Sequence, residues 1–191
     1  MKQVYSYKQG FTLVELLIVI VIIGILAAIS IVAYDGVQQR AKNTAIINAA
    51  SQPLKAIEAY IATTGEFPLT GVSCITTDTY CNSSYSSSEP IAVNPTFQNN
   101  IATVSSLPKS IPFSGTNLRG LLYIFDSSVK IDGEPHPARL RYYLLGKQQK
   151  CELPGVISGN YPNYTLSTTG YTTNESSVNK TACEVVISKT L

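Results

Sequence analysis

The sequence predicts an α+β fold in which one long N-terminal helix packs on a small antiparallel sheet. The first observation is an apolar segment from Leu16 to Tyr34 whose only polar side chain is Ser30. The second is an amphipathic pattern that continues the helix to Thr63. The third is a set of short strand patterns that begin at Leu121. Together they predict an anchored helix that carries a globular head.

The apolar segment is long enough to cross a membrane. At about 1.5 Å per residue it spans about 28 Å, close to the roughly 30 Å hydrocarbon core of a bilayer. Extending the helix back to Phe11 places Glu15 at or near the membrane interior, where a carboxylate needs a partner. We expect that partner to be a cation in another copy. A cut between Gly10 and Phe11 would create such a cation, a free amine one helical turn from Glu15.

The ten residues before that cut form a short basic leader. They include Lys2 and Lys8 and no acidic residue, and the apolar core follows the cut, whereas in an ordinary secretory signal it precedes the cut. The run Lys8-Gln9-Gly10, followed by Phe11-Thr12-Leu13-Val14-Glu15-Leu16-Leu17, resembles the prepilin motif, or class III signal peptide, of type IV pilins. The resemblance covers Lys8 to about Ala33 and is only architectural beyond about Gly71.

This resemblance implies a life cycle and a set of partners. A prepilin peptidase and methyltransferase in the membrane would cut after Gly10 and methylate the new amine of Phe11. Glu15 would pair with the terminal amine of a neighbouring copy while the inner-membrane pilus assembly machinery builds a helical homopolymer or a mixed pilus. The precursor would lie in the cytoplasmic membrane and the pilus outside the cell, serving adhesion, twitching motility or DNA uptake. We expect neither enzymatic activity nor a cofactor.

Helix flexibility is the point where the chain departs from this family. Many members have a proline where this chain has Val32, and their helix melts between that proline and a glycine that Gly24 matches. With Val32 in place of proline, melting of this helix stays open. Gly36 and Pro53 are further weak points, and we expect a bend at Pro53 without an end. The helix should stop at Gly65.

We expect four parts along the chain. Residues 1–10 form the leader, 11–34 the transmembrane and assembly half of the helix, 35–64 its amphipathic half, and 65–191 the extracytoplasmic head. The head should contain a long polar loop at 70–120 and about four antiparallel strands, at 121–125, 139–145, 164–167 and 182–188. We expect the sheet to bury Ile47, Leu54, Ile57 and Ile61 of the helix.

Cysteine usage and charge restrict the function further. An even number of cysteines, four, in an exported head predicts two disulfides. Of the three connectivities we favour Cys74 with Cys81 and Cys151 with Cys183. The chain has 14 basic and 12 acidic residues, and removing Lys2 and Lys8 leaves 12 of each. Net charge therefore does not support binding to nucleic acid.

The remaining candidates for chemistry are weak. His136 lies alone between two prolines, where a solvated loop residue is the usual outcome. Asp126, Asp132 and Glu134 offer oxygens, but their spacing does not reproduce an EF-hand loop, so we expect no metal site. Four Asn-x-Ser/Thr triplets leave glycosylation open, beginning at Asn82, Asn163, Asn174 and Asn179.

Two other functions fit parts of the sequence. A pseudopilin of a type II secretion or competence system would have the same N-terminal residues and would form short periplasmic stubs in place of surface fibres. A monomeric membrane-anchored binding protein or enzyme would keep an uncleaved N-terminus.

Overall fold

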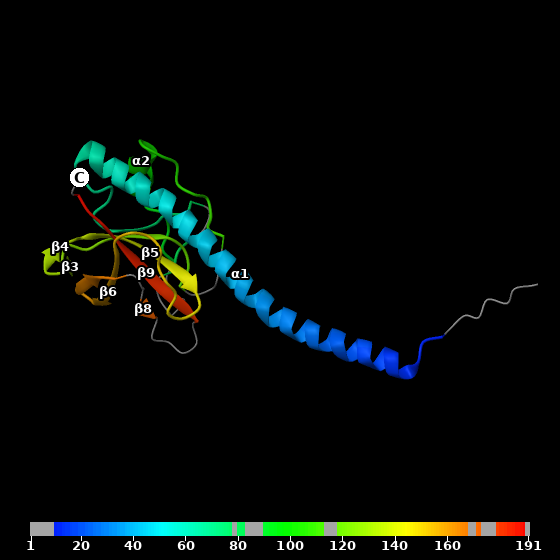
Figure 1. Ribbon diagram of the computed structural model, residues 1–191. Helices are drawn as coiled ribbons and strands as arrows, with labels where there is room; N and C mark the ends of the chain where they lie inside the picture. The colour runs from blue at the N-terminus through cyan, green and yellow to red at the C-terminus, as the bar shows by residue number, and fades with distance from the viewer. Residues whose placement is uncertain are drawn as a thin grey trace, which may run out of the picture. The chain divides into compact units, whose positions relative to one another are not determined.

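The computed structural model describes residues 10–77, 80–82, 90–112, 118–167, 171–172 and 179–189. The chain divides into two compact units, Met1–Arg40 and Ala41–Leu191. Helix α1, Leu13–Thr64, belongs to both units, and the described strands and helix α2 belong to the second (Figure 1). The predicted α+β fold, a long N-terminal helix with an antiparallel-rich sheet, is confirmed.

The part of α1 in the second unit buries one stripe of side chains. At most 4 % of the surface of Ile46, Ala50, Leu54, Ile57 and Ile61 is exposed, and these residues recur at steps of three or four. The expectation for Ile47 was wrong, because it is only half-buried and Ile46 lies in the stripe instead. One residue turns the helix by about 100°, and Ile46 lies four residues before Ala50 on the same face.

The end of α1 follows the expected signals. The helix runs through Pro53, which is buried, and ends at Thr64. Gly65 takes a left-handed conformation with φ of 72°, and its N–H donates to the carbonyl of Ile61 at 2.8 Å. Glycine adopts this conformation without strain, which explains the end of the helix at this residue. The bend expected at Pro53 stays a prediction.

The region at 70–120 holds more structure than a surface loop. Strand β1 covers Val72–Cys74, and helix α2 covers Pro95–Ala102. The side chain of Asn94 accepts a hydrogen bond from the N–H of Thr96 at 2.9 Å and caps α2. Phe97 and Ile101 of α2 are fully buried. This short helix therefore closes part of the core.

Nine strands form one sheet in the described part of the head, more than the four expected. The order is β1-β2-β5-β9-β6-β7-β3-β4, with β8 also on β9, and the pairs are antiparallel except for β3 with β7. The strands after β1 are β2 Leu122–Phe125, β3 Lys130–Ile131, β4 Glu134–Pro135, β5 Ala138–Leu145, β6 Val156–Asn160, β7 Asn163–Leu166, β8 Tyr171–Thr172 and β9 Lys180–Ile187.

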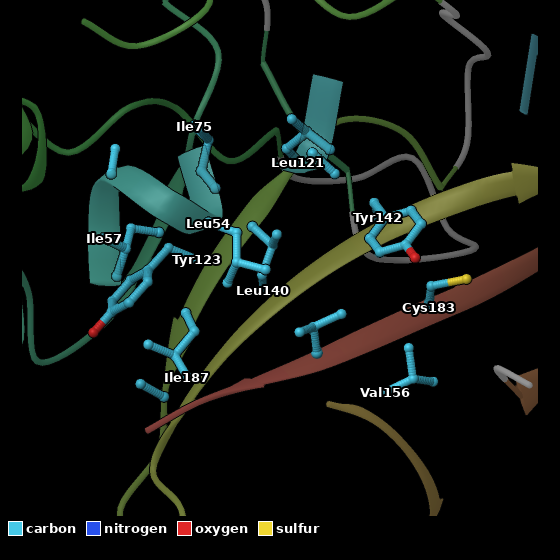
Figure 2. Packing of buried hydrophobic residues seen from close by; sticks show 14 of the residues in the cluster. Leu54, Ile57, Ile75, Leu121, Tyr123, Leu140, Tyr142, Val156, Cys183 and Ile187 are labelled. Atoms are coloured by element: carbon cyan, nitrogen blue, oxygen red, sulfur yellow. The ribbon is translucent and has the colours of Figure 1, made fainter. Parts of the chain in front are cut away.

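One face of this sheet packs on the buried stripe of α1. In Figure 2, Leu54 and Ile57 of the helix lie beside Tyr123, Leu140 and Ile187 of the sheet, and all five belong to one buried cluster. The hydroxyl of Tyr123 donates to the carbonyl of Leu69 at 2.9 Å. Burial of these side chains is what holds the helix on the sheet.

The opposite face of the sheet buries charge. Arg139 and Arg141 of β5 lie beside Glu184 of β9, which is fully buried. Arg141 donates to Glu184 in a salt bridge, and Nε of Arg139 lies 3.6 Å from Oε2 of the same carboxylate. The guanidinium of Arg139 also lies 5.4 Å from the ring centre of Tyr164. These contacts account for the two alternating arginines as structural residues, since a buried carboxylate requires paired donors.

Candidate assembly site at the start of α1

The first turn of α1 is closed by a reciprocal pair of hydrogen bonds between Thr12 and Glu15. The N–H of Glu15 donates to Oγ1 of Thr12 at 3.2 Å, and the N–H of Thr12 donates to Oε2 of Glu15 at 2.8 Å. Because the helix begins at Leu13, Thr12 occupies the N-cap and Glu15 the third helical position, which is a capping box. The Thr-x-x-Glu spacing was a signal for this box in the sequence.

The same carboxylate oxygen of Glu15 takes a second hydrogen bond. The hydroxyl of Thr12 donates to Oε2 at 2.7 Å, so this oxygen receives two donors from one residue. Among the described residues, no donor reaches the other oxygen, Oε1. The carboxylate is therefore held in one orientation against the first turn, with one oxygen open to an external cation.

The surface of α1 beyond this site is apolar and uncovered. From Phe11 to Ile31, each large apolar side chain is between 50 % and 88 % exposed. By length and composition α1 is able to cross a membrane. The hydroxyl of Ser30, the one polar side chain in the apolar segment, donates to the carbonyl of Leu26 at 2.7 Å and adds no polar surface that needs a partner.

The expected weak points of the helix stay untested. The backbone is helical at Gly24 and Gly36, and a Cβ at either position would meet no other atom within 4 Å. Packing within the described chain therefore does not require glycine at either place. Flexibility at Gly24, Gly36 or Pro53 remains an expectation.

The predicted presence of disulfides is confirmed, and the two bonds match the favoured pairing. They join Cys74 with Cys81 and Cys151 with Cys183. The first closes a short loop after β1, and the second ties the segment before β6 to β9. Gly120 has φ of 94°, and a Cβ there would collide with Sγ of Cys81, which explains glycine at this position.

The other candidates take structural roles. Nδ1 of His136 lies 3.5 Å from Oγ of Ser188. The carboxylate of Asp126 accepts from the N–H and the hydroxyl of Ser128 in a turn. Asp132 and Glu134 are exposed, and in the described residues no group of three His, Cys, Asp or Glu side chains could hold a metal ion.

The Asn-x-Ser/Thr triplets differ in exposure. Asn82 is buried, with 2 % of its surface exposed, and bridges to Arg119 through backbone hydrogen bonds. Asn163 and Asn179 are exposed. Asn174 lies outside the described residues, as do Lys2 and Lys8 of the expected leader.

Comparison with known proteins matches the segment that contains the capping box. A family model described as the prokaryotic N-terminal methylation motif matches residues 5–31. The chain therefore carries the prokaryotic N-terminal methylation motif. The resemblance that the sequence shows from Lys8 to about Ala33 is therefore confirmed as far as Ile31, and Thr12 and Glu15 lie inside the matched segment.

Curated relatives match only part of this chain, and the match covers only part of each relative. A fimbrial protein of Neisseria meningitidis serogroup A is 40% identical over 68 residues, which are 36% of this chain and 40% of that protein. Fimbrial protein EcpC of Eikenella corrodens is 38% identical over 80 residues, 40% of this chain and 52% of its own length.

A third relative carries the word pilin in its name. The type IV major pilin protein PilE1 of Neisseria gonorrhoeae is 40% identical over 63 residues, 33% of this chain and 38% of its own length. The chain thus spans about two fifths to one half of the relatives it matches. No solved structure matches the chain.

Proposed function

We propose that this chain is a type IV pilin subunit that polymerises through α1 into an extracellular filament. The precursor is held in the cytoplasmic membrane by residues 11–34, is cut after Gly10, and is methylated at Phe11. The inner-membrane assembly machinery then moves it into a helical homopolymer or a mixed pilus, with the head, residues 65–191, outside. The role is structural, with no catalysis and no cofactor.

One observation carries this proposal: α1 has an uncovered apolar surface, and its first turn, inside the matched motif, carries the carboxylate of Glu15 in a capping box. The large apolar side chains from Phe11 to Ile31 are at least half exposed, and such a surface needs lipid or other protein to cover it. Packing identical helices against one another covers it in a filament. Head-to-tail contacts between identical copies build an open helical assembly when the rotation between copies does not close into a ring, and such an assembly is a fibre.

The charge at Glu15 supplies selectivity in this assembly. A carboxylate in an apolar medium is strongly stabilised by a nearby cation. The amine of a cleaved Phe11 in the next copy is such a cation, and Oε1 of Glu15 is the acceptor open to it. Before assembly, Thr12 donates two hydrogen bonds to Oε2 of Glu15. The incoming amine would bind Oε1, so it adds a contact without displacing these hydrogen bonds.

The mature N-terminus provides the first test. Mass spectrometry of the chain purified from its native cells is expected to find it starting at N-methylated Phe11, without Met1 to Gly10. An intact Met1 together with a monomeric chain would contradict the proposal and support a membrane-anchored monomer instead.

Imaging distinguishes a pilus from a pseudopilus. Immunogold labelling of the head on intact cells is expected to decorate long surface fibres. If the cleaved chain is found only in short periplasmic structures, the subunit is a pseudopilin of a secretion or competence system. The two disulfides of the head are typical of proteins in an oxidising environment outside the cytoplasm.

A further inference from the structure

Two features of opposite charge lie at opposite ends of the second unit, Ala41–Leu191. At one end Asn43 of α1 is hydrogen-bonded to Leu145, the last residue of β5. At the other end, Ile61 of α1 and Val186, near the end of β9, both line a hollow. Asn43 and Ile61 are 18 residues apart, so the two ends are separated by about 27 Å along the helix.

The hollow at the second end, here called the Glu58 hollow, has a volume of about 380 Å³. Three separate segments line it. Its apolar wall is formed by Ile61, Ala62, Pro154 and Val186, and its two charged lining residues are Glu58 and Lys189. Nζ of Lys189 forms a salt bridge with Oε2 of Glu66 at 3.5 Å. Among the described residues, no cation lies within ion-pair distance of Glu58.

Glu58 is an exposed residue whose carboxylate is partly screened from solvent at the edge of the hollow. Partial burial raises the pKa of Glu58, and the positive charge of Lys55 lowers it in part. A cation entering the hollow would therefore find an acid whose charge is not yet compensated. The apolar wall suits the aliphatic stem of a lysine, whose ammonium would reach Glu58 at the hollow's polar side.

The first end presents two such lysines on a fixed turn. Residues 146–150, here called the lysine turn, follow β5, and both Lys147 and Lys150 are exposed. Nδ2 of Asn43 donates to the carbonyl of Leu145 at 2.9 Å and to Oε1 of Gln149 at 3.3 Å. The N–H of Gln149 donates to Oγ1 of Thr181 at 2.9 Å, and that hydroxyl donates to the carbonyl of Gly146 at 2.7 Å. The turn is ordered before any partner arrives, which lowers the entropy lost on binding.

We propose that the lysine turn of one copy docks into the Glu58 hollow of a second copy of this chain in the filament. The inference rests on the proposed function. A single copy cannot join its own two ends across about 27 Å of helix, whereas a head-to-tail series of copies brings unlike ends together at every step. The partner is thus another protomer. Its lysine side chains would pair with the carboxylate of Glu58 and pack their stems on the apolar wall of the hollow.

Charge reversal tests the pairing in full-length protein expressed in its native cells. Glu58→Lys alone, and Lys147→Glu with Lys150→Glu, are each expected to lower the fraction of chain in sheared fibres at least about threefold, because like charges replace the attraction. Combining all three reversals is expected to restore that fraction. Matched controls are Gln52→Lys on another face of α1 and Lys109→Glu, both exposed and outside either feature.

A crosslink provides a second readout, measured as the crosslinked fraction of the chain within the fibres that do form. Fibres are built from a variant with Glu58→Cys and Lys147→Cys and treated with a short bismaleimide. The described cysteines are already paired, so the new thiols are the intended targets. A ladder of covalent multimers is expected, and Gln52→Cys with Lys147→Cys should give far less.

The outcomes separate this inference from the proposed function. Two results together would overturn the docking of the lysine turn: normal fibre yield from both single-end reversals, and no ladder from the variant with Glu58→Cys and Lys147→Cys. They would leave the pilin proposal standing. A combined reversal as defective as the single-end reversals would also overturn the docking. Wild-type chain that is never found in fibres would overturn the proposed function, and the docking with it.

Discussion

The two halves of α1 share residue types and differ in what covers them. From Leu13 to Ile31 the large apolar side chains are between 50 % and 88 % exposed, while Ile46, Ala50, Leu54, Ile57 and Ile61 are at most 4 % exposed. The second half is amphipathic because a sheet of the same chain covers one of its faces. The first half is apolar all round, and nothing in the described chain covers it. In the proposed function, lipid covers it before assembly and neighbouring copies cover it in the filament.

Truncating one leucine in each half gives the largest contrast. Leu54→Ala is expected to lower the free energy of unfolding of the head by about 2 to 5 kcal/mol, because it opens a cavity in the core. Leu17→Ala, on the exposed half, should leave that free energy within about 0.5 kcal/mol of wild type. Denaturant unfolding of the full chain in detergent micelles measures both. Equal losses would mean that the two halves are not distinct.

The two disulfides stabilise the head to different degrees. A cross-link over a sequence separation of 32, Cys151 with Cys183, is expected to contribute about 4 kcal/mol by restricting the unfolded chain. The bond between Cys74 and Cys81, at a separation of 7, should contribute about 2 kcal/mol. Paired Cys→Ser variants compared by the same unfolding experiment test this order. A reversed order would show that strain in the folded head outweighs loop length.

Asn43 marks the place where the covered half of α1 begins. Its side chain makes hydrogen bonds to both backbone groups of Leu145 and to Gln149 while 7 % exposed. Asn43→Ala is expected to destabilise the head by about 1 to 3 kcal/mol, because the buried hydrogen bonds from Asn43 to Leu145 and Gln149 are lost. Asn48→Ala, an exposed asparagine on the same helix, is the control and should have little effect. Thermal unfolding measures the difference, and an equal effect of the control would contradict the role of Asn43.

The smallest expected effect concerns a turn in the head, far from either half of α1 in sequence. Hydrogen bonds from the side chain and then the backbone of Ser128 hold the pKa of Asp126 below its ordinary value of 3.8. A lowered pKa stabilises the fold above that ordinary value, and the contribution disappears as the pH falls through the lowered pKa. Ser128→Ala should therefore destabilise at pH 7 by less than about 1 kcal/mol, since the turn is exposed, and the difference from wild type should shrink below about pH 4. A difference that does not change with pH would contradict this origin.

The sequence predicted those parts of the fold that depend on local pattern. The long helix, its end at Gly65, and the strands around residues 121–125 and 139–145 follow from periodicity and from glycine. Helix α2 was missed although Asn94 followed by Pro95 is a usual helix start, because the surrounding Ser, Thr and Asn residues obscured it. The capping box of Thr12 and Glu15 likewise has a local signal, the Thr-x-x-Glu spacing.

Other features depend on contacts between distant segments and had no local signal. The two-residue strands β3, β4 and β8 exist only through their pairing with distant strands. The partner of Arg141 became known only from its register opposite Glu184. The Glu58 hollow is assembled from α1, the turn before β6 and the end of β9, so no stretch of sequence could have indicated it.

The central claim is that the charge of Glu15, beyond its capping role, selects subunits for the filament. Glutamine can take the place of glutamate in a capping box and carries no charge. Glu15→Gln therefore separates the two roles, and Glu15→Val removes both. We would co-express each variant with wild type and measure, by quantitative mass spectrometry, its ratio to wild type in the membrane and in sheared fibres.

Glu15→Gln and Glu15→Val are both expected to be inserted and cleaved normally and to be strongly depleted from fibres. Equal incorporation of Glu15→Gln and wild type, with only Glu15→Val depleted, would contradict the central claim, because the glutamate would then serve the helix start alone.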